Sequence, residues 1–285
     1  MDLNIFDDDF LYDGFQKFGV GGMISAIPHY SSLQYKKNLA IAMMASRGGF
    51  SSLDYVKKRF GNTLKINEIE LSEPHQIIFE INKYVKQYVN TLSQRIDQIP
   101  DKTYPDTFGY LVASVALRRL RTSFKLARFS LFEGFRIESM CIIKLILEQC
   151  TWAYSVYNLT NEKVNTIQPS KSINNFKSVY PNIGKIYGEI NEVSHLSTSR
   201  IRELVDIKDE EIWIKLTSPK DTLHTSLILL LATDIYCITS EIIFKKLLPT
   251  VDFINSQNNL PNRNRAFLTD FILFKKRVEN LWSDK

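Results

Sequence analysis

Hydrophobic residues recur every three or four positions over most of the chain after Pro74, with polar residues between them. This spacing places them on one face of an α-helix. We expect one helix over 74–99 and a second that begins near Asp106 or Thr107, separated by Pro100. The second has the most regular apolar face, made of Tyr110, Ala113, Leu117, Leu120, Phe124, Ala127 and Leu131. Such a face packs against neighbouring helices on one side only.

The segment after Gly134 is hydrophobic nearly all round from Phe135 to Tyr157, which is typical of a helix in the middle of a bundle. Further helices are expected at 172–179, 181–194, 208–216 and 222–248, and a last one carries Phe267, Phe271, Phe274, Val278 and Leu281. No alternating pattern could build a sheet-based core. The sequence therefore predicts an all-α fold, a helical bundle domain over 74–285 with a central hydrophobic helix.

Residues 1–73 differ from the rest and are expected to form a smaller N-terminal appended region. Helices are predicted at 32–46 and 51–60, and 63–71 reads as a short strand or an extended connector. Two helices followed by a strand suggest a winged helix-turn-helix. Because the second helix is short and has few base-reading side chains, a plain helical appendage is favoured.

Composition adds little to this picture. The formal net charge is +5, which is compatible with a polyanionic partner without being diagnostic. The three cysteines form no Cys-x-x-Cys pair and lie in apolar stretches, as small hydrophobic residues do. The chain starts with acidic residues rather than a signal peptide, and Asp234 and Glu241 interrupt the apolar segment 223–248. We therefore expect a cytoplasmic protein with no membrane partner.

No motif for a cofactor or a metal ion is present. The glycines at 19, 21 and 22 lack the lysine of a phosphate-binding loop, and no cluster of cysteine and histidine has metal-ligand spacing. We expect no cofactor and no metal. Helical bundles often dimerise through an apolar helix face, and the candidate here is the last helix, with Phe267, Phe271 and Phe274.

Lys144 and Glu148 stand one turn apart on the otherwise apolar central helix. Because an isolated buried charge costs several kcal/mol, the two side chains must pair with each other or reach other polar groups. A structural ion pair is the favoured interpretation. The alternative is a carboxylate held in a cleft for acid–base chemistry.

A second polar set consists of Tyr187, Asn191 and His195, which follow one another at steps of four on a predicted helix. His195 opens a polar run that ends at Arg200, whose hydroxyl, imidazole and guanidinium groups suit a phosphate or simply cap the next helix.

A basic stripe, Arg118, Arg121, Lys125 and Arg128, lies beside the apolar face of the second long helix. Such a stripe can neutralise phosphates. The favoured alternative is a solvated face, or pairing with acidic residues such as Glu210 and Glu211.

The segments Arg121–Gly134 and Ile142–Glu148, followed by Tyr187, Asn191 and His195, resemble an uncharacterised family of bacterial helical proteins. That family is similar to HEPN-type bundles, many of which are RNA-cleaving toxins or phage-defence effectors, while others bind RNA or nucleotides without cleaving. The resemblance spans residues 118–248. The chain departs from active HEPN ribonucleases because none of its histidines follows an arginine by four to six residues.

The resemblance implies a protein that binds or acts on RNA. His195 would be the acid–base group, Glu148 or Tyr187 would orient it, Asn191 would complete the set, and the basic stripe with Arg200 would hold the RNA backbone. Two alternatives remain open: a non-catalytic interaction module in which the polar residues fix helix packing, and a DNA-binding regulator acting through residues 1–73.

Overall fold

The computed structural model describes residues 15–20, 23–28, 31–61, 73–100, 105, 107–132, 135–195, 205–208, 211–214 and 219–283. The chain forms two compact units, Met1–Gln76 and Ile77–Lys285. Each unit is described separately below.

The first unit contains two strands and two helices. Strand β1 (Phe15–Val20) pairs antiparallel with β2 (Met23–Pro28), ahead of α1 (Leu33–Arg47) and α2 (Leu53–Phe60). Both helices lie where the sequence predicts them. The hydroxyl of Ser52 caps α2 by accepting from the N–H of Tyr55.

The described part of this region also contains a β-hairpin ahead of its two helices, which the sequence did not predict. The alternation that marks a half-buried strand is visible in β2, where Ile27 is buried and Ile24 is exposed. It extends over only six residues, too few to stand out against helical spacing. Residues 63–71, the expected strand or connector, lie outside the described residues, and the strands that are described precede the two helices.

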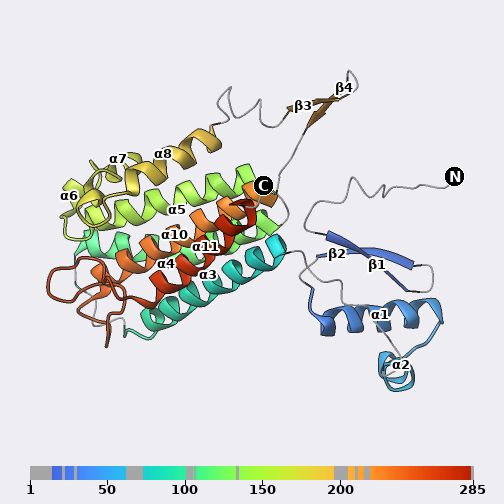
Figure 1. The fold of residues 1–285 in the computed structure, drawn as a ribbon. Helices are drawn as coiled ribbons and strands as arrows, with labels where there is room; N and C mark the ends of the chain where they lie inside the picture. The colour runs from blue at the N-terminus through green and yellow to red at the C-terminus, as the bar shows by residue number, and fades with distance from the viewer. Residues whose placement is uncertain are drawn as a thin grey trace. The chain divides into compact units, whose positions relative to one another are not determined.

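The second unit is the helical bundle, so the predicted all-α fold is confirmed. Its long helices are α3 (Glu73–Asp97), α4 (Phe108–Phe132), α5 (Arg136–Val156), α8 (Ile183–Ser194), α10 (Pro219–Phe244) and α11 (Ala266–Ser283). Short turns α6 (Asn161–Val164), α7 (Pro169–Ser172) and η3 (Asn175–Ser178) connect α5 to α8. In Figure 1 the long helices run roughly side by side.

Helix α5 is the hub of the packing, since it contacts α4, α8 and α10. The predicted apolar face of α4 is confirmed: all seven of its residues are buried. Helix α10 is enclosed even more completely than α5, because every residue from Ala232 to Phe244 is buried. Among the described residues one helix, Lys220–Phe244, is long and apolar enough to cross a membrane, and 89 % of its most apolar window is buried inside the bundle. Such burial is what a core helix requires.

The helix expected at 208–216 was wrong. Strand β3 (Val205–Lys208) pairs there with β4 (Glu211–Ile214). In β3, valine and isoleucine alternate with Asp206 and Lys208, and in β4 two isoleucines alternate with Glu211 and Trp213. The register pairs Val205 with Ile214, both β-branched residues. Four residues are too short for this alternation to be separated from a helical pattern.

The apolar face of α11 faces inward. Phe267 and Phe274 are each 1 % exposed, and their rings make edge contacts with Tyr88 and Tyr84 of α3. Two of the three phenylalanines expected on a dimer face, Phe267 and Phe274, therefore pack within the bundle, and Phe271 is half-buried. A dimer through this helix stays a prediction.

Candidate functional site

Four of the residues singled out from the sequence meet between α5 and α8. Lys144 Nζ lies 2.9 Å from His195 Nε2, and the hydroxyl of Tyr187 donates to Glu148 Oε1 over 2.5 Å. Lys144 Nζ also lies 5.8 Å from the centre of the Tyr187 ring, a cation–π contact. We call Lys144, Glu148, Tyr187 and His195 the α5–α8 cluster.

The two charges of α5 reach across to α8 instead of pairing with each other. Within the described residues, Lys144 and Glu148 form no ion pair, although they stand one turn apart. Each instead has a hydrogen-bond partner on α8, so the cluster fastens the two helices together. Burial and the hydrogen bond to Glu148 raise the pKa of the Tyr187 hydroxyl, so this group stays a donor at neutral pH.

His195 ends α8 and is exposed, whereas the other three members of the cluster are half-buried. An ammonium group has no acceptor, so Lys144 donates to Nε2, and the imidazole must be neutral to accept. The orienting partner of His195 is therefore Lys144, whereas Glu148 and Tyr187 bond to each other. Asn191 contributes its backbone: its carbonyl oxygen accepts from the N–H of His195 at 3.1 Å and from the Ser194 hydroxyl at 3.2 Å.

A basic groove lies between α3 and α4. It is a hollow of about 450 Å³ whose lining combines cationic, polar and apolar side chains: Val85, Lys86, Val89, Asn90, Arg121, Thr122, Phe124, Lys125 and Arg128. Three residues of the predicted basic stripe thus enter one hollow, and Lys86 of α3 adds a fourth cation from the facing helix. Sequence spacing on α4 alone gave no sign of Lys86, because only packing brings α3 beside it.

Asp97 is the acidic partner of the stripe. Its two carboxylate oxygens lie 3.5 Å from Arg118 Nη1 and 3.7 Å from Arg121 Nη1. Both pairs are exposed and lie at the end of α3. Glu210 and the side chain of Glu211, the acidic partners that the sequence had suggested, lie outside the described residues. Arg118 does not line the groove. Arg200 lies outside the described residues.

The basic groove and the α5–α8 cluster are separate places on the bundle. In Figure 1, α8 runs along one side of α5, whereas α3 lies on the opposite side of the bundle. The sequence had placed the stripe and His195 in a single site. The structure instead has a cationic groove in one place and a small hydrogen-bonded polar cluster in another.

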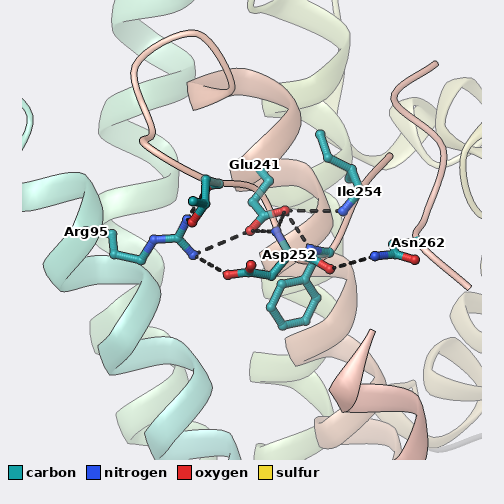
Figure 2. Close-up of polar contacts among 7 residues, drawn as sticks. Arg95, Glu241, Asp252, Ile254 and Asn262 are labelled. Atoms are coloured by element: carbon teal, nitrogen blue, oxygen red, sulfur yellow. Dashed lines mark hydrogen bonds and ion pairs between the residues drawn. The ribbon is translucent and has the colours of Figure 1, made fainter. Parts of the chain in front are cut away.

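The carboxylate of Glu241 on α10 holds a site that the sequence showed only as an interruption of an apolar segment. This side chain is fully buried and accepts from the backbone N–H groups of Asp252, Phe253 and Ile254, at 2.7 to 3.2 Å. Figure 2 shows Arg95 of α3 reaching both carboxylates, with its Nη1 atom 2.9 Å from Asp252 and 3.6 Å from Glu241. Burial raises the pKa of Glu241, and the N–H donors oppose that shift. The arrangement ties the segment after α10 to the core.

A second buried acid on the same helix completes this anchoring. Asp234 receives two hydrogen bonds from Arg265, from Nε at 2.8 Å and from Nη2 at 2.6 Å. Both side chains are nearly enclosed. Burial raises the pKa of Asp234, and the guanidinium group opposes that shift. The two acids that appeared in the sequence as interruptions of an apolar segment are therefore structural anchors for residues 249–265.

Among the residues that the structure describes, no group of three or more histidine, cysteine or acidic side chains is close enough to hold a metal ion. Cys141 is exposed, and Cys150 and Cys237 are buried, all as free thiols. The chain matches no protein-family model, no curated protein sequence and no solved structure. The family resemblance of residues 118–248 therefore stays a prediction, and the geometry of the groove and the cluster carries the argument about function.

Proposed function

We propose that this chain binds RNA through the basic groove between α3 and α4. The observation that carries the proposal is the convergence of Lys86, Arg121, Lys125 and Arg128 on one hollow of about 450 Å³. Cations on two facing helices can contact a phosphate backbone from both sides. Neutralising several phosphates releases counterions, which makes the binding strong at low salt and weak at high salt.

The other lining residues suit the same ligand. Asn90 and Thr122 offer uncharged hydrogen-bonding groups, and Val85, Val89 and Phe124 supply an apolar floor. A backbone of alternating phosphate and sugar presents both kinds of surface. The preference for RNA over other polyanions comes from the resemblance to HEPN-type proteins, as does a role as a toxin or phage-defence effector.

The test is the affinity of the purified chain for a labelled RNA oligonucleotide at several salt concentrations. The informative variant carries Lys86→Glu with Lys125→Glu, because both side chains are exposed and their replacement should leave the fold intact. We expect an affinity at least about tenfold lower and a shallower salt dependence. The matched control carries Lys163→Glu with Lys171→Glu, the same charge change on α6 and α7. Equal weakening by both variants would refute a groove-specific site.

A second candidate function is RNA cleavage at the α5–α8 cluster, with His195 as the acid–base group. It is favoured by the exposed imidazole held 2.9 Å from the Lys144 ammonium, since a cation beside a base can stabilise a phosphate during reaction. The competing possibility is that the cluster only fixes α8 to α5. Incubation of total RNA with the wild-type chain and with His195→Ala separates the two, because only the catalytic role makes cleavage depend on His195.

A further inference from the structure

The outward side of α4 carries a row of exposed hydrophobic residues. Its members are between 40 % and 58 % exposed and run along nearly the whole helix: Phe108, Leu111, Val115, Leu126 and Phe129. Exposed single hydrophobic residues are common, but five on one side of one helix form a patterned surface that suits an interaction. They fall into two groups, 108–115 and 126–129, with the exposed Arg118, Arg119 and Thr122 between them. We call these five residues the α4 outer row.

The outer row is a true helical face. Its members are separated by three, four, eleven and three residues, which correspond closely to whole turns of 3.6 residues. They stand opposite the buried face of the same helix, in which Leu117 and Leu120 are fully enclosed. Helix α4 therefore has two apolar sides, and the bundle of residues 77–285 covers only one of them.

Cations border the outer row, and α4 contains no acidic residue. Arg118, Arg119 and Lys125 are exposed beside it, with Arg121 further round on the groove side. If two copies of the chain paired through this row, the same cations would face one another across the contact. Like charges in that position are destabilising, so the charge pattern disfavours a second copy and favours an anionic surface.

We propose that the α4 outer row binds the surface of an anionic lipid bilayer. A helix with large apolar side chains on one strip and arginine and lysine at its border lies flat in the headgroup region, with the apolar strip inserted and the cations at the phosphates. The outer row lies on one helix and extends over about 32 Å, because Phe108 and Phe129 are 21 positions apart and each helical residue rises 1.5 Å. A planar surface can contact such a strip along its whole length.

This inference goes beyond RNA binding and rests on different apolar side chains, with Lys125 bordering both surfaces. The sequence predicted no membrane partner because only a spanning segment was considered there, and α10 is indeed enclosed within the bundle. The proposed attachment is peripheral and places no helix across the bilayer. It depends on apolar residues of α4, whereas the proposed RNA site depends on the cations of the groove.

The experiment is co-sedimentation of the full chain with phosphatidylcholine vesicles and with vesicles of equal parts phosphatidylcholine and phosphatidylglycerol. We expect binding to the anionic vesicles and little binding to the neutral ones. The variant Leu126→Gln with Phe129→Gln keeps every cation, so it should bind anionic vesicles at least about tenfold more weakly while its affinity for RNA is unchanged. The matched control, Ile272→Gln with Leu273→Gln on α11, removes equally exposed apolar residues and should bind as the wild type does.

Three outcomes would overturn the proposal. The wild-type chain fails to sediment with anionic vesicles, or the Leu126→Gln, Phe129→Gln variant sediments as well as the wild type. The third is that the wild-type chain is a dimer that binds no vesicles, and that the double substitution makes it monomeric, as measured by size-exclusion chromatography with light scattering. The outer row would then contact a second copy of the chain. If the chain binds RNA but no vesicles, the proposed function stands and only the membrane proposal fails. If it binds anionic vesicles but no RNA, only the proposed RNA binding fails.

Discussion

The ammonium group of Lys144 on α5 donates a hydrogen bond to Nε2 of His195 at the end of α8, across 2.9 Å. Because only a neutral imidazole can accept this bond, the single N–H of the ring is at Nδ1. The lone pair that a general base needs is thus occupied, so in the proposed RNA cleavage the substrate would have to displace Lys144 before His195 could remove a proton. A phosphate group drawn to the Lys144 ammonium would do so.

The first prediction concerns His195. We expect His195→Ala to abolish RNA cleavage and to change the free energy of unfolding by less than about 1 kcal/mol, because the pair with Lys144 is at the surface. Gel analysis of total RNA and urea denaturation measure the two effects. The control is His224→Ala, which removes another exposed histidine with one acidic partner, Glu189. Cleavage by His195→Ala at the wild-type rate would show that the cluster is structural only.

The second prediction concerns the hydrogen bond from Tyr187 to Glu148. Tyr187→Phe leaves a half-buried carboxylate without its donor, so we expect a loss of about 1 kcal/mol in the free energy of unfolding. Urea denaturation measures it. Tyr154→Phe is the control, since within the described residues the Tyr154 hydroxyl makes no hydrogen bond. Equal effects of the two substitutions would mean that the bond to Glu148 contributes nothing.

The third prediction concerns Glu241. Glu241→Ala leaves three backbone N–H groups without an acceptor, two of them on the buried residues Phe253 and Ile254, and we expect a loss of about 3 kcal/mol or more. Hydrogen exchange at Asp252, Phe253 and Ile254 should accelerate more than exchange in α5. The exposed Glu162 provides the control, because Glu162→Ala should leave stability nearly unchanged. Unaltered exchange at the three amides would contradict the anchoring role.

The fourth prediction concerns the buried pair of Asp234 and Arg265. Arg265→Met leaves an enclosed carboxylate without its partner and should cost about 3 kcal/mol or more. Without the guanidinium group the pKa of Asp234 rises further, so the variant should regain stability as the pH falls and the carboxylate is protonated. The double variant Asp234→Leu, Arg265→Met should be closer to the wild type than Arg265→Met alone. Thermal denaturation at several pH values measures all three chains.

The fifth prediction concerns alkaline pH. Burial raises the pKa of the hydroxyls of Tyr88, Tyr180 and Tyr236 above the ordinary value of 10.0. Because the folded value lies above the unfolded one, each contributes stability that is present below pH 10.0 and lost as the pH rises further. The loss is about 1.4 kcal/mol per pH unit for each group. Thermal denaturation should show it, with a shallower slope for Tyr236→Phe; an equal slope would refute this contribution.

The long helices could be predicted because their signal is local. The recurrence of Tyr110, Leu117, Phe124 and Leu131 on one face depends only on the turn of the α-helix, and burial followed that face. The strands of four to six residues could not be recognised, because so few positions do not distinguish a period of two from one of 3.6. Their pairing with a neighbouring strand decides the conformation.

For the candidate sites too, spacing within one helix could be predicted and contacts between helices could not. Step counting along single helices identified Lys144 with Glu148, Tyr187 with His195, and the basic stripe of α4. The packing of α5 on α8 alone decided that these two pairs exchange partners, and the packing of α3 on α4 decided that Lys86 joins the stripe. The spacing of side chains within a helix is set by its backbone hydrogen bonds, so it can be predicted from the sequence. Which helices become neighbours depends on burying all apolar faces at once, and only the folded chain settles that.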